Sequence, residues 1–341
     1  MNIKNKYQYS LEIVGSCNLR CPSCPVGNMN TREVAKKMIP KELFMKIIDK
    51  ISIETPVKNP TISLFDWGEP TLHPELPFFI KYINSKNLRS RISSNLNTNA
   101  DFEKIMYANP SEFKISLSGF YEKNYSITHK RGKISKVLEN MKTIKSFKDQ
   151  FGSTTKIIVG YHLYRHNLLE DFNEMKKLTE ELGFIFEPDI AHFMPIEKIL
   201  SLLKNECEAD VQIDVPEITE DDKQLIKILL TNPKKQYLKW KKNNQNSPCT
   251  RLEYKTAIRV DGSIPICCGV YSDKYIVAKN FLDLTFNEIK KRRDNYDLCT
   301  TCMKNGAHVN WKNSKFDFLN RYIPNKNIIG KFLRYYFSKQ S

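Results

Sequence analysis

The feature that most constrains the fold is a regular alternation of strand-like and helix-like segments over the first 190 residues. Six apolar runs rich in β-branched and aromatic residues predict strands at 9–15, 61–67, 90–95, 113–119, 156–164 and 184–190. Between most of them lie helix-period stretches that begin at Pro40, Pro74, Ala100, Lys136 and Leu169. Such alternation forms parallel sheets with right-handed crossovers. We expect an α/β fold, either an open doubly wound sheet or part of a (β/α) barrel, with its site at the carboxyl ends of the strands.

Three cysteines gather on a short loop directly after the first expected strand. The stretch VGSCNLRCPSCP places Cys17, Cys21 and Cys24 within eight positions. Zinc in a structural site takes four protein ligands, whereas a redox disulfide needs only two cysteines. Three thiolates on a 4Fe–4S cube instead leave one iron without a protein ligand. We favour such an open iron site, with zinc binding and thiol redox chemistry as the alternatives.

The remaining composition indicates the compartment in which this loop functions. Apolar runs are short and interrupted by Lys, Asp or Asn, and the first 15 residues lack the apolar core of a signal peptide. We therefore expect a cytoplasmic protein without a transmembrane span. In that reducing setting, nine cysteines indicate metal binding or redox chemistry more than a disulfide framework.

The segment CNLRCPSC resembles the C-x3-C-x2-C signature of the radical S-adenosylmethionine (radical SAM) superfamily. The resemblance implies a partial (β/α)6 TIM-type barrel in which Cys17, Cys21 and Cys24 bind a 4Fe–4S cluster and the open iron binds SAM. In that family, one electron from the cluster cleaves SAM to a 5′-deoxyadenosyl radical, which abstracts hydrogen from the substrate. The position before the third cysteine is often aromatic in the family and is Ser23 here.

The stretch DWGEP, after the second expected strand, resembles the GGEP motif of the same family, which gathers the SAM amino group. Gly68, Glu69 and Pro70 match, and Trp67 replaces the first glycine. A glycine lets the backbone approach a ligand, and a carboxylate accepts a charge-assisted hydrogen bond from an ammonium group. Outside this context GEP would be an ordinary turn. The resemblance implies further SAM contacts at the ends of the third and fourth strands, at Ser94, Asn95, Ser116 and Ser118.

A second group of cysteines follows later in the chain, at Cys249, Cys267, Cys299 and Cys302. Four thiolates are a full complement for zinc or for a 4Fe–4S cluster, and in isolation we would favour zinc. Behind a radical SAM core, however, the C-x12-G-x4-C…C-x2-C spacing resembles the twitch extension, a shortened SPASM domain. This resemblance implies one auxiliary 4Fe–4S cluster. Cys268 competes with Cys267 as a ligand, and the spacing from Gly262 favours Cys267.

These features divide the chain into three expected parts. They are a radical SAM core over 1–235, a small α+β twitch/SPASM-like cluster domain over 236–320, and a basic aromatic tail over 321–341. A charged helical connector over 196–248 spans the boundary between the first two parts. In the second, a hairpin is expected around Asp261–Gly262, and Thr285 with Glu288 forms a helix-starting capping box. We favour packing of the tail against its own domain over contact with a membrane surface.

Net charge is uneven along the chain and bears on the partners. The formal charge is +16, and residues from 234 onward hold 22 Lys and Arg against 8 Asp and Glu. A Lys-rich surface is the simple interpretation. The functional one is contact with an acidic electron donor such as a flavodoxin or ferredoxin. The sequence lacks GxGxxG and P-loop patterns, so SAM is the one nucleotide-like ligand expected, and nucleic-acid binding is not expected.

Within the radical SAM interpretation we favour a two-electron oxidation of a small polar or sugar-like metabolite, with the auxiliary cluster as electron acceptor. Only 16 residues precede Cys17, so we expect no N-terminal peptide-recognition or cobalamin-binding domain. His162, Glu187 and His192 are candidate substrate bases, with none preferred. The alternatives are a peptide-modifying maturase, an epimerase in which Cys207 or Cys268 donates a hydrogen atom, and a non-catalytic protein that binds zinc or nucleic acid.

Overall fold

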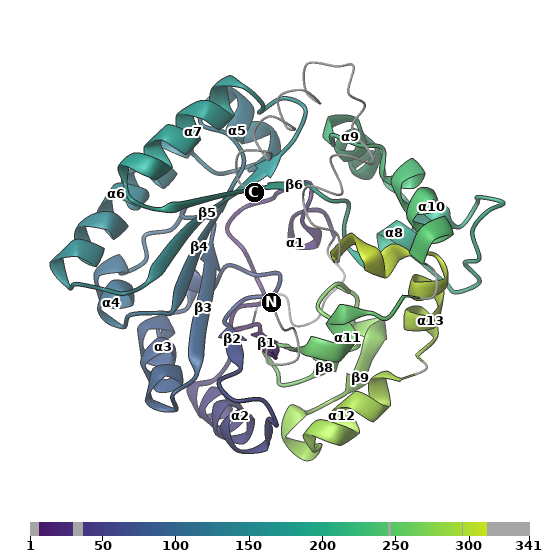
Figure 1. Ribbon diagram of the computed structural model, residues 1–341, viewed down its shortest axis with the longest axis horizontal. Coiled ribbons are helices and arrows are strands. Elements are labelled where there is room, and N and C mark those ends of the chain that lie inside the picture. The colour runs from purple at the N-terminus through teal and green to yellow at the C-terminus, as the bar shows by residue number, and fades with distance from the viewer. Residues whose placement is uncertain (1–6, 30–36, 245–246, 295, 312–341) are drawn as a thin grey trace.

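Seven parallel strands form one curved sheet in the order β6-β5-β4-β3-β2-β1-β7 (Figure 1). The computed structural model describes residues 7–29, 37–244, 247–294 and 296–311, so the expected tail over 321–341 lies outside the described residues. All six expected strands are present. The strands are β1 (Gln8–Leu11), β2 (Thr61–Ser63), β3 (Arg89–Ser94), β4 (Glu112–Leu117), β5 (Lys156–Leu163), β6 (Ile185–Ile190) and β7 (Lys255–Ile258).

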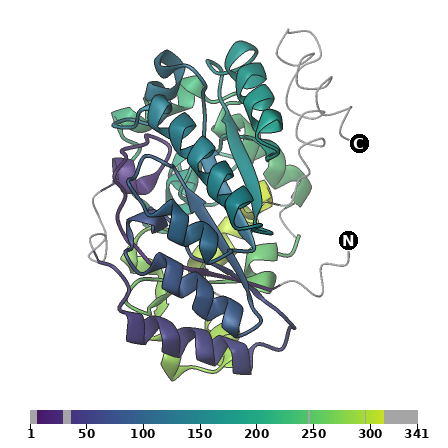
Figure 2. The same cartoon turned by 90° about the vertical axis from the view of Figure 1, so that its left-hand side faces the viewer.

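The sheet curves into an open partial barrel, as expected, with helices on its outer face (Figure 1). In α2 (Lys41–Glu54), the buried residues Phe44, Ile47, Ile48 and Ile51 recur at helical spacing and form one apolar stripe. The other expected outer helices are α3 (Leu76–Ser85), α4 (Phe102–Tyr107), α6 (Ile134–Gln150) and α7 (Glu170–Glu181). Figure 2 shows these helices stacked in a row over the sheet. The short α5 (Glu122–Thr128) was not predicted.

The seventh strand departs from the expected arrangement. The turn at Asp261–Gly262 forms as predicted, since Gly262 has a φ of +82° and its N–H donates to the Arg259 carbonyl at 2.9 Å. Its two arms then separate into different sheets. β7 pairs in parallel with β1, whereas β8 (Ile264–Pro265) pairs antiparallel with β9 (Ile276–Ala278). Thus β7 lies in the range expected for the small domain but completes the main sheet.

Short helices make up most of the remaining described chain, opposite β3–β5 in Figure 1. The connector contains α8 (Ile196–Leu203), α9 (Glu220–Ile228) and α10 (Pro233–Asn244), as its charged helical pattern predicts. A buried ion pair between Lys198 and Asp222, at 2.7 Å, joins α8 to α9. Beyond it lie α11 (Thr250–Tyr254), α12 (Phe286–Arg293) and α13 (Asp297–Lys304). The predicted Thr285–Glu288 capping box starts α12. Across the described ranges, no helix combines the length and apolarity needed to cross a membrane.

Candidate functional site

The three-cysteine loop leaves the carboxyl end of β1 and ends in the single-turn helix α1 (Pro25–Asn28). All three thiols are partly buried. The Cys17 sulfur accepts hydrogen bonds from the Leu19 backbone N–H at 3.4 Å and from the Asn95 amide at 3.5 Å. Since Asn95 directly follows β3, the loop is held against the carboxyl end of a second strand, where the site was expected.

Gly68 allows the GEP segment to touch the cysteine loop. A Cβ atom on Gly68 would lie 1.8 Å from the Val14 carbonyl oxygen. The next residue, Glu69, donates its backbone N–H to the Ser16 carbonyl at 2.9 Å. The sequence predicted that this glycine admits a ligand, and the structure shows that it admits the backbone of the cysteine loop.

The Glu69 carboxylate joins two segments at this end of the sheet, its own and the one that follows β3. It is buried, and it accepts from the Asn95 backbone N–H at 2.8 Å and from the Thr71 N–H and hydroxyl at 3.1 and 2.6 Å. The Thr71 N–H bond caps η2 (Pro70–Leu72), which begins at the predicted Pro70. Burial raises the pKa of Glu69, although these hydrogen bonds oppose the shift. The structure therefore gives Glu69 a positioning role, and its contact with SAM stays a prediction.

Two of the other predicted SAM contacts lie beside this carboxylate. Ser94 closes β3, and its hydroxyl lies 3.3 Å from that of Thr71. Asn95 bridges Cys17 and Asn18, with its amide nitrogen 3.0 Å from the Asn18 side-chain oxygen. The fold thus brings Cys17, Glu69, Ser94 and Asn95 together from three separate segments.

The remaining two predicted contacts lie at the end of β4. Ser118 is buried, with its hydroxyl 2.5 Å from that of Thr128 and 3.1 Å from His129 Nδ1. Burial lowers the pKa of His129 to about 3, and His162 adds to the shift. Ser116 is only partly buried and pairs in register with Gly160 of β5. Ser118 therefore belongs to a polar cluster at the end of α5.

The protonation of the three thiols shows what their ligand has to supply. Burial raises the pKa of Cys17 to about 12, and the nearby charge of Glu69 adds to the shift. Burial also raises the pKa of Cys21 well above its usual value, with Cys24 and Cys17 contributing repulsion. Three thiolates in this setting need a strongly positive group among them, as metal ions provide. The donor set therefore fits an iron–sulfur cluster.

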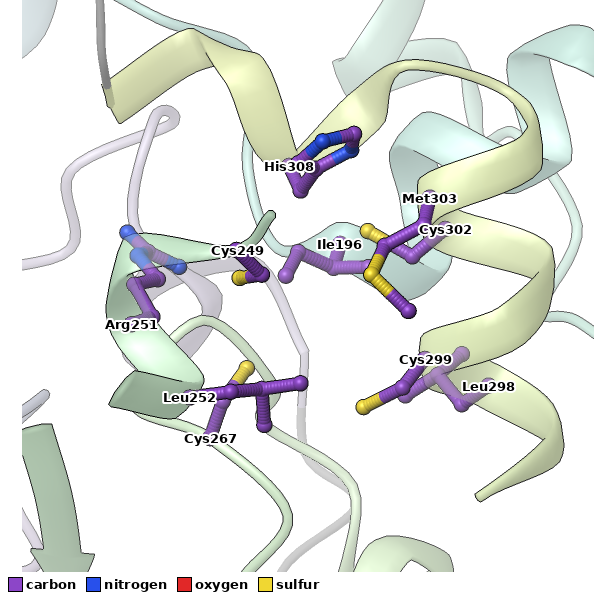
Figure 3. A pocket seen from close by; sticks show the side chains of 10 residues that line it. All are labelled: Ile196, Cys249, Arg251, Leu252, Cys267, Leu298, Cys299, Cys302, Met303 and His308. Carbon is purple, nitrogen blue, oxygen red and sulfur yellow. The ribbon is translucent and has the colours of Figure 1, made fainter. Parts of the chain in front are cut away.

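The second cysteine set lines one pocket (Figure 3). Cys249 caps α11, Cys267 follows β8, and Cys299 and Cys302 lie three residues apart on one face of α13. Figure 3 shows their sulfur atoms directed into a common space. The rest of the lining is largely apolar and includes Ile196, Leu252, Leu298 and Met303. Burial raises the pKa of Cys267 to about 12 and that of Cys302 well above its usual value.

Cys268 has different surroundings from its neighbour. Cys267 lines the pocket and accepts from the Gly269 N–H at 3.3 Å, whereas Cys268 is absent from the pocket lining. Burial of Cys268 opposes ionisation, but Lys255 and Arg251 outweigh it, so the pKa of this thiol is lowered. This geometry agrees with the preference for Cys267, although which of the two binds a cluster stays a prediction. Cys207, the other spare cysteine, is exposed.

In the structure, neither cysteine set is arranged around one point. Tetrahedral zinc requires sulfur atoms about 2.3 Å from one point. In the described part of the chain, no group of three or more His, Cys, Asp or Glu side chains is arranged to hold one metal ion.

Comparison with known proteins assigns a family to the segment that contains the first of these sites. Residues 11–178 match the profile of the Radical SAM superfamily. This segment forms a radical SAM domain. It runs from the last residue of β1 into α7 and includes Cys17, Cys21 and Cys24 together with the DWGEP stretch. A search of curated protein sequences finds no match to the chain.

The likeness to solved structures covers the radical SAM domain and continues into the later part of the chain. Native anSMEcpe with bound AdoMet is 16% identical, with 85% of this chain and 81% of that chain covered and a TM-score of 0.53. SuiB of Streptococcus suis, bound to the precursor peptide SuiA, is 12% identical, with 88% and 70% covered and a TM-score of 0.55. At these identities the likeness establishes a common fold.

Sequence reasoning missed part of the support for the cysteine loop of the radical SAM domain. The Arg20 N–H donates to the Lys130 carbonyl at 3.0 Å, just beyond α5. The Asn97 amide bonds the Tyr125 hydroxyl at 2.6 Å, and the Tyr125 ring stacks on His129 with centroids 4.5 Å apart. The first two contacts join positions far apart in the chain, so no local pattern signals them.

Proposed function

We propose that this protein is a radical SAM enzyme that oxidises a small polar or sugar-like metabolite by two electrons. The observation that carries the proposal is the pairing of two cysteine sites. In the radical SAM domain, the Cys17 thiol contacts Asn95, which in turn bonds Glu69, at the carboxyl end of the sheet. Four further thiols share one pocket in the later part of the chain.

The first set has the residues that a SAM-cleaving site needs. When bound, a 4Fe–4S cluster with one open iron supplies the electron for reductive cleavage of SAM to a 5′-deoxyadenosyl radical, which takes a hydrogen atom from the substrate. Cys17, Cys21 and Cys24 would hold that cluster, and the Asn95 amide would orient Cys17 through its bond to the sulfur. The residues proposed to contact SAM are Gly68, Glu69, Pro70, Ser94, Asn95, Ser116 and Ser118.

The second set supports an oxidative outcome. Cys249, Cys267, Cys299 and Cys302 would hold an auxiliary 4Fe–4S cluster with no open iron, a type suited to electron transfer. A substrate that has lost a hydrogen atom completes its oxidation by losing one electron and one proton, and a neighbouring cluster can accept that electron. The excess of positive charge from residue 234 onward favours an acidic flavodoxin or ferredoxin as the external donor. We place the reaction in the cytoplasm.

A peptide-modifying role is the second candidate. The observation that favours it is the likeness of fold to SuiB, which was solved with its precursor peptide SuiA. The two candidates differ in the substrate that stimulates 5′-deoxyadenosine formation. A panel of sugars and amino alcohols, assayed beside a panel of short peptides, separates them.

The first test is iron and sulfide content after anaerobic reconstitution, combined with a 5′-deoxyadenosine assay. We expect about eight irons per chain in the wild type and about four in a Cys17/Cys21/Cys24→Ala triple variant, which should also lose SAM cleavage. Four irons in the wild type would remove the auxiliary cluster and the oxidation argument with it. Zinc without iron would contradict the enzyme assignment itself.

A further inference from the structure

A second cavity lies at the opposite end of the sheet from the cysteine loop. Its wall includes the first residue of each of five strands, namely Gln8, Thr61, Arg89, Glu112 and Lys255. The cysteine loop follows the last residue of β1. Parallel strands begin at one edge of a sheet and end at the other, so the cavity and the radical SAM site occupy different ends of the partial barrel.

The size of this cavity suits a metabolite. Its volume is about 720 Å³, within the range of roughly 300 to 1,000 Å³ that is typical of small-molecule sites. Most of the lining residues have polar or charged side chains, and the Tyr7 and Tyr254 rings add apolar surface to the wall. A concave polar wall of this size encloses a small ligand better than it meets the flat surface of a protein partner.

The charge of the lining selects the class of ligand. Five cationic side chains and one carboxylate line the cavity, which gives 5 − 1 = +4, and two of the cations, Arg251 and Lys255, also act on the Cys268 thiol. The cations are Lys58, Arg89, Arg91, Arg251 and Lys255. The carboxylate belongs to Glu112, which pairs with Arg91 across neighbouring strands. Like charges gathered on a concave wall repel one another and concentrate positive potential in the cavity, and a bound anion relieves that repulsion.

We propose that this cavity is a binding site for a small polyanionic metabolite, recognised through phosphate or carboxylate groups. Arginine guanidinium groups match both oxyanions through paired N–H donors. Arg89 and Lys58 at the exposed rim attract the ligand, and Arg91 and the buried Arg251 lie deeper. The site is separate from the radical SAM site, because none of its residues belongs to the cysteine loop or to the GEP segment, whereas Arg251 is shared with the pocket of the second cysteine set.

The test is calorimetric titration of the full-length protein with inorganic pyrophosphate and, separately, with citrate, both at constant ionic strength. We expect saturable one-site binding of at least one anion, and the preferred anion distinguishes a phosphate from a polycarboxylate ligand. In a Lys58→Gln/Arg89→Gln variant the affinity should fall at least tenfold. Both side chains are exposed, so the fold should be retained, which circular dichroism checks.

The matched control changes the same charge elsewhere on the molecule. Lys142 of α6 and Lys177 of α7 are exposed on the outer helices, and neither lines the cavity. A Lys142→Gln/Lys177→Gln variant should bind the anion as the wild type does. No binding to the wild type, or an equal loss in both variants, would overturn the proposal. The proposal would also be overturned if no anion bound and flavodoxin reduced the Lys58→Gln/Arg89→Gln variant more slowly than the wild type. That result would make this end of the sheet a protein-docking surface.

Discussion

The indole Nε1 of Trp67 donates a hydrogen bond to the Val270 backbone carbonyl at 3.1 Å. Trp67 directly precedes the GEP segment of the radical SAM domain, and Val270 lies three residues after Cys267 of the second set. The Trp67 ring also meets Tyr271 edge to face, with centroids 6.2 Å apart. The residue that departs from the GGEP pattern is therefore the one that ties the two cysteine sites together.

A Trp67→Phe substitution should weaken this connection. It keeps an aromatic ring but removes the N–H donor, so the free energy of unfolding should fall by about 1 kcal/mol. Urea unfolding of wild type and variant measures the change. Tyr107→Phe is the control, because Tyr107 is 61% exposed and loses only a surface hydroxyl. Equal stability of Trp67→Phe and the wild type would show that the hydrogen bond contributes nothing.

Gly68→Ala should disrupt the contact between the GEP segment and the cysteine loop. The added methyl would lie 1.8 Å from a backbone oxygen, which cannot move aside as a flexible side chain does. We expect a loss of about 3 kcal/mol or more in unfolding free energy, together with a loss of iron at the first cluster.

Gly152→Ala separates this clash from the general cost of replacing a glycine. Gly152 has a φ of +57°, and a Cβ atom there would meet nothing within 4 Å. The cost should be about 1 kcal/mol, from backbone strain alone, and the iron content should match the wild type. If both variants lost the same stability and iron, the close approach at Gly68 would not be the cause.

The core strands were predictable because each carries its own periodicity, whereas strand partners depend on distant residues. β2 to β6 begin within a residue of the predicted positions. Nothing in the four residues Lys-Thr-Ala-Ile of β7 specifies β1 as a partner. The pairing joins Lys255 to Gln8, which lies 247 residues earlier in the chain.

The site shows the same division between local and distant information. The cysteine spacing and the GEP segment were enough to locate the parts of the site, because each is a short local pattern whose residue types follow from its chemistry or its turn geometry. The Trp67 bond to Val270 and the support from the Tyr125 region arise only on folding. Likewise, the sequence predicted that Gly68 gives the backbone access to a ligand. The close approach of Val14 to Gly68 could not be predicted, because it depends on how two separate segments pack together.

Cys267→Ala and Cys268→Ala should have different effects on the auxiliary cluster. Cys267 shares the pocket of Cys249, Cys299 and Cys302, whereas Cys268 lies near Lys255. We expect Cys267→Ala to lose about four irons per chain and Cys268→Ala to lose none. Iron analysis after anaerobic reconstitution distinguishes them, and the reverse result would assign Cys268 as the ligand.

His129 should make the protein less stable as the pH falls below neutrality. Its native pKa of about 3 lies below the unfolded value of about 6.5, so between these values the unfolded chain binds a proton that the native protein excludes. From pH 7 to pH 5 this group alone should remove about 2 kcal/mol of unfolding free energy.

The measurement is denaturant unfolding at pH 7 and pH 5 for the wild type and His129→Asn, whose amide can still bond the Ser118 hydroxyl. Between pH 7 and pH 5, the free energy of unfolding should fall by about 2 kcal/mol less in the variant than in the wild type. Identical pH dependence in the two proteins would mean that His129 does not remain neutral in the native state.

The pairing of β7 with β1 has a consequence for biosynthesis. β1 carries the cysteine loop at its end, yet one of its two neighbours in the sheet is made about 250 residues later. Closing so long a loop is entropically costly and slow compared with the local β/α contacts. During translation, the first cysteine set therefore emerges on an edge strand long before that edge is covered. Assembly of the proposed cluster on Cys17, Cys21 and Cys24 has this interval in which to occur, before the sheet is complete.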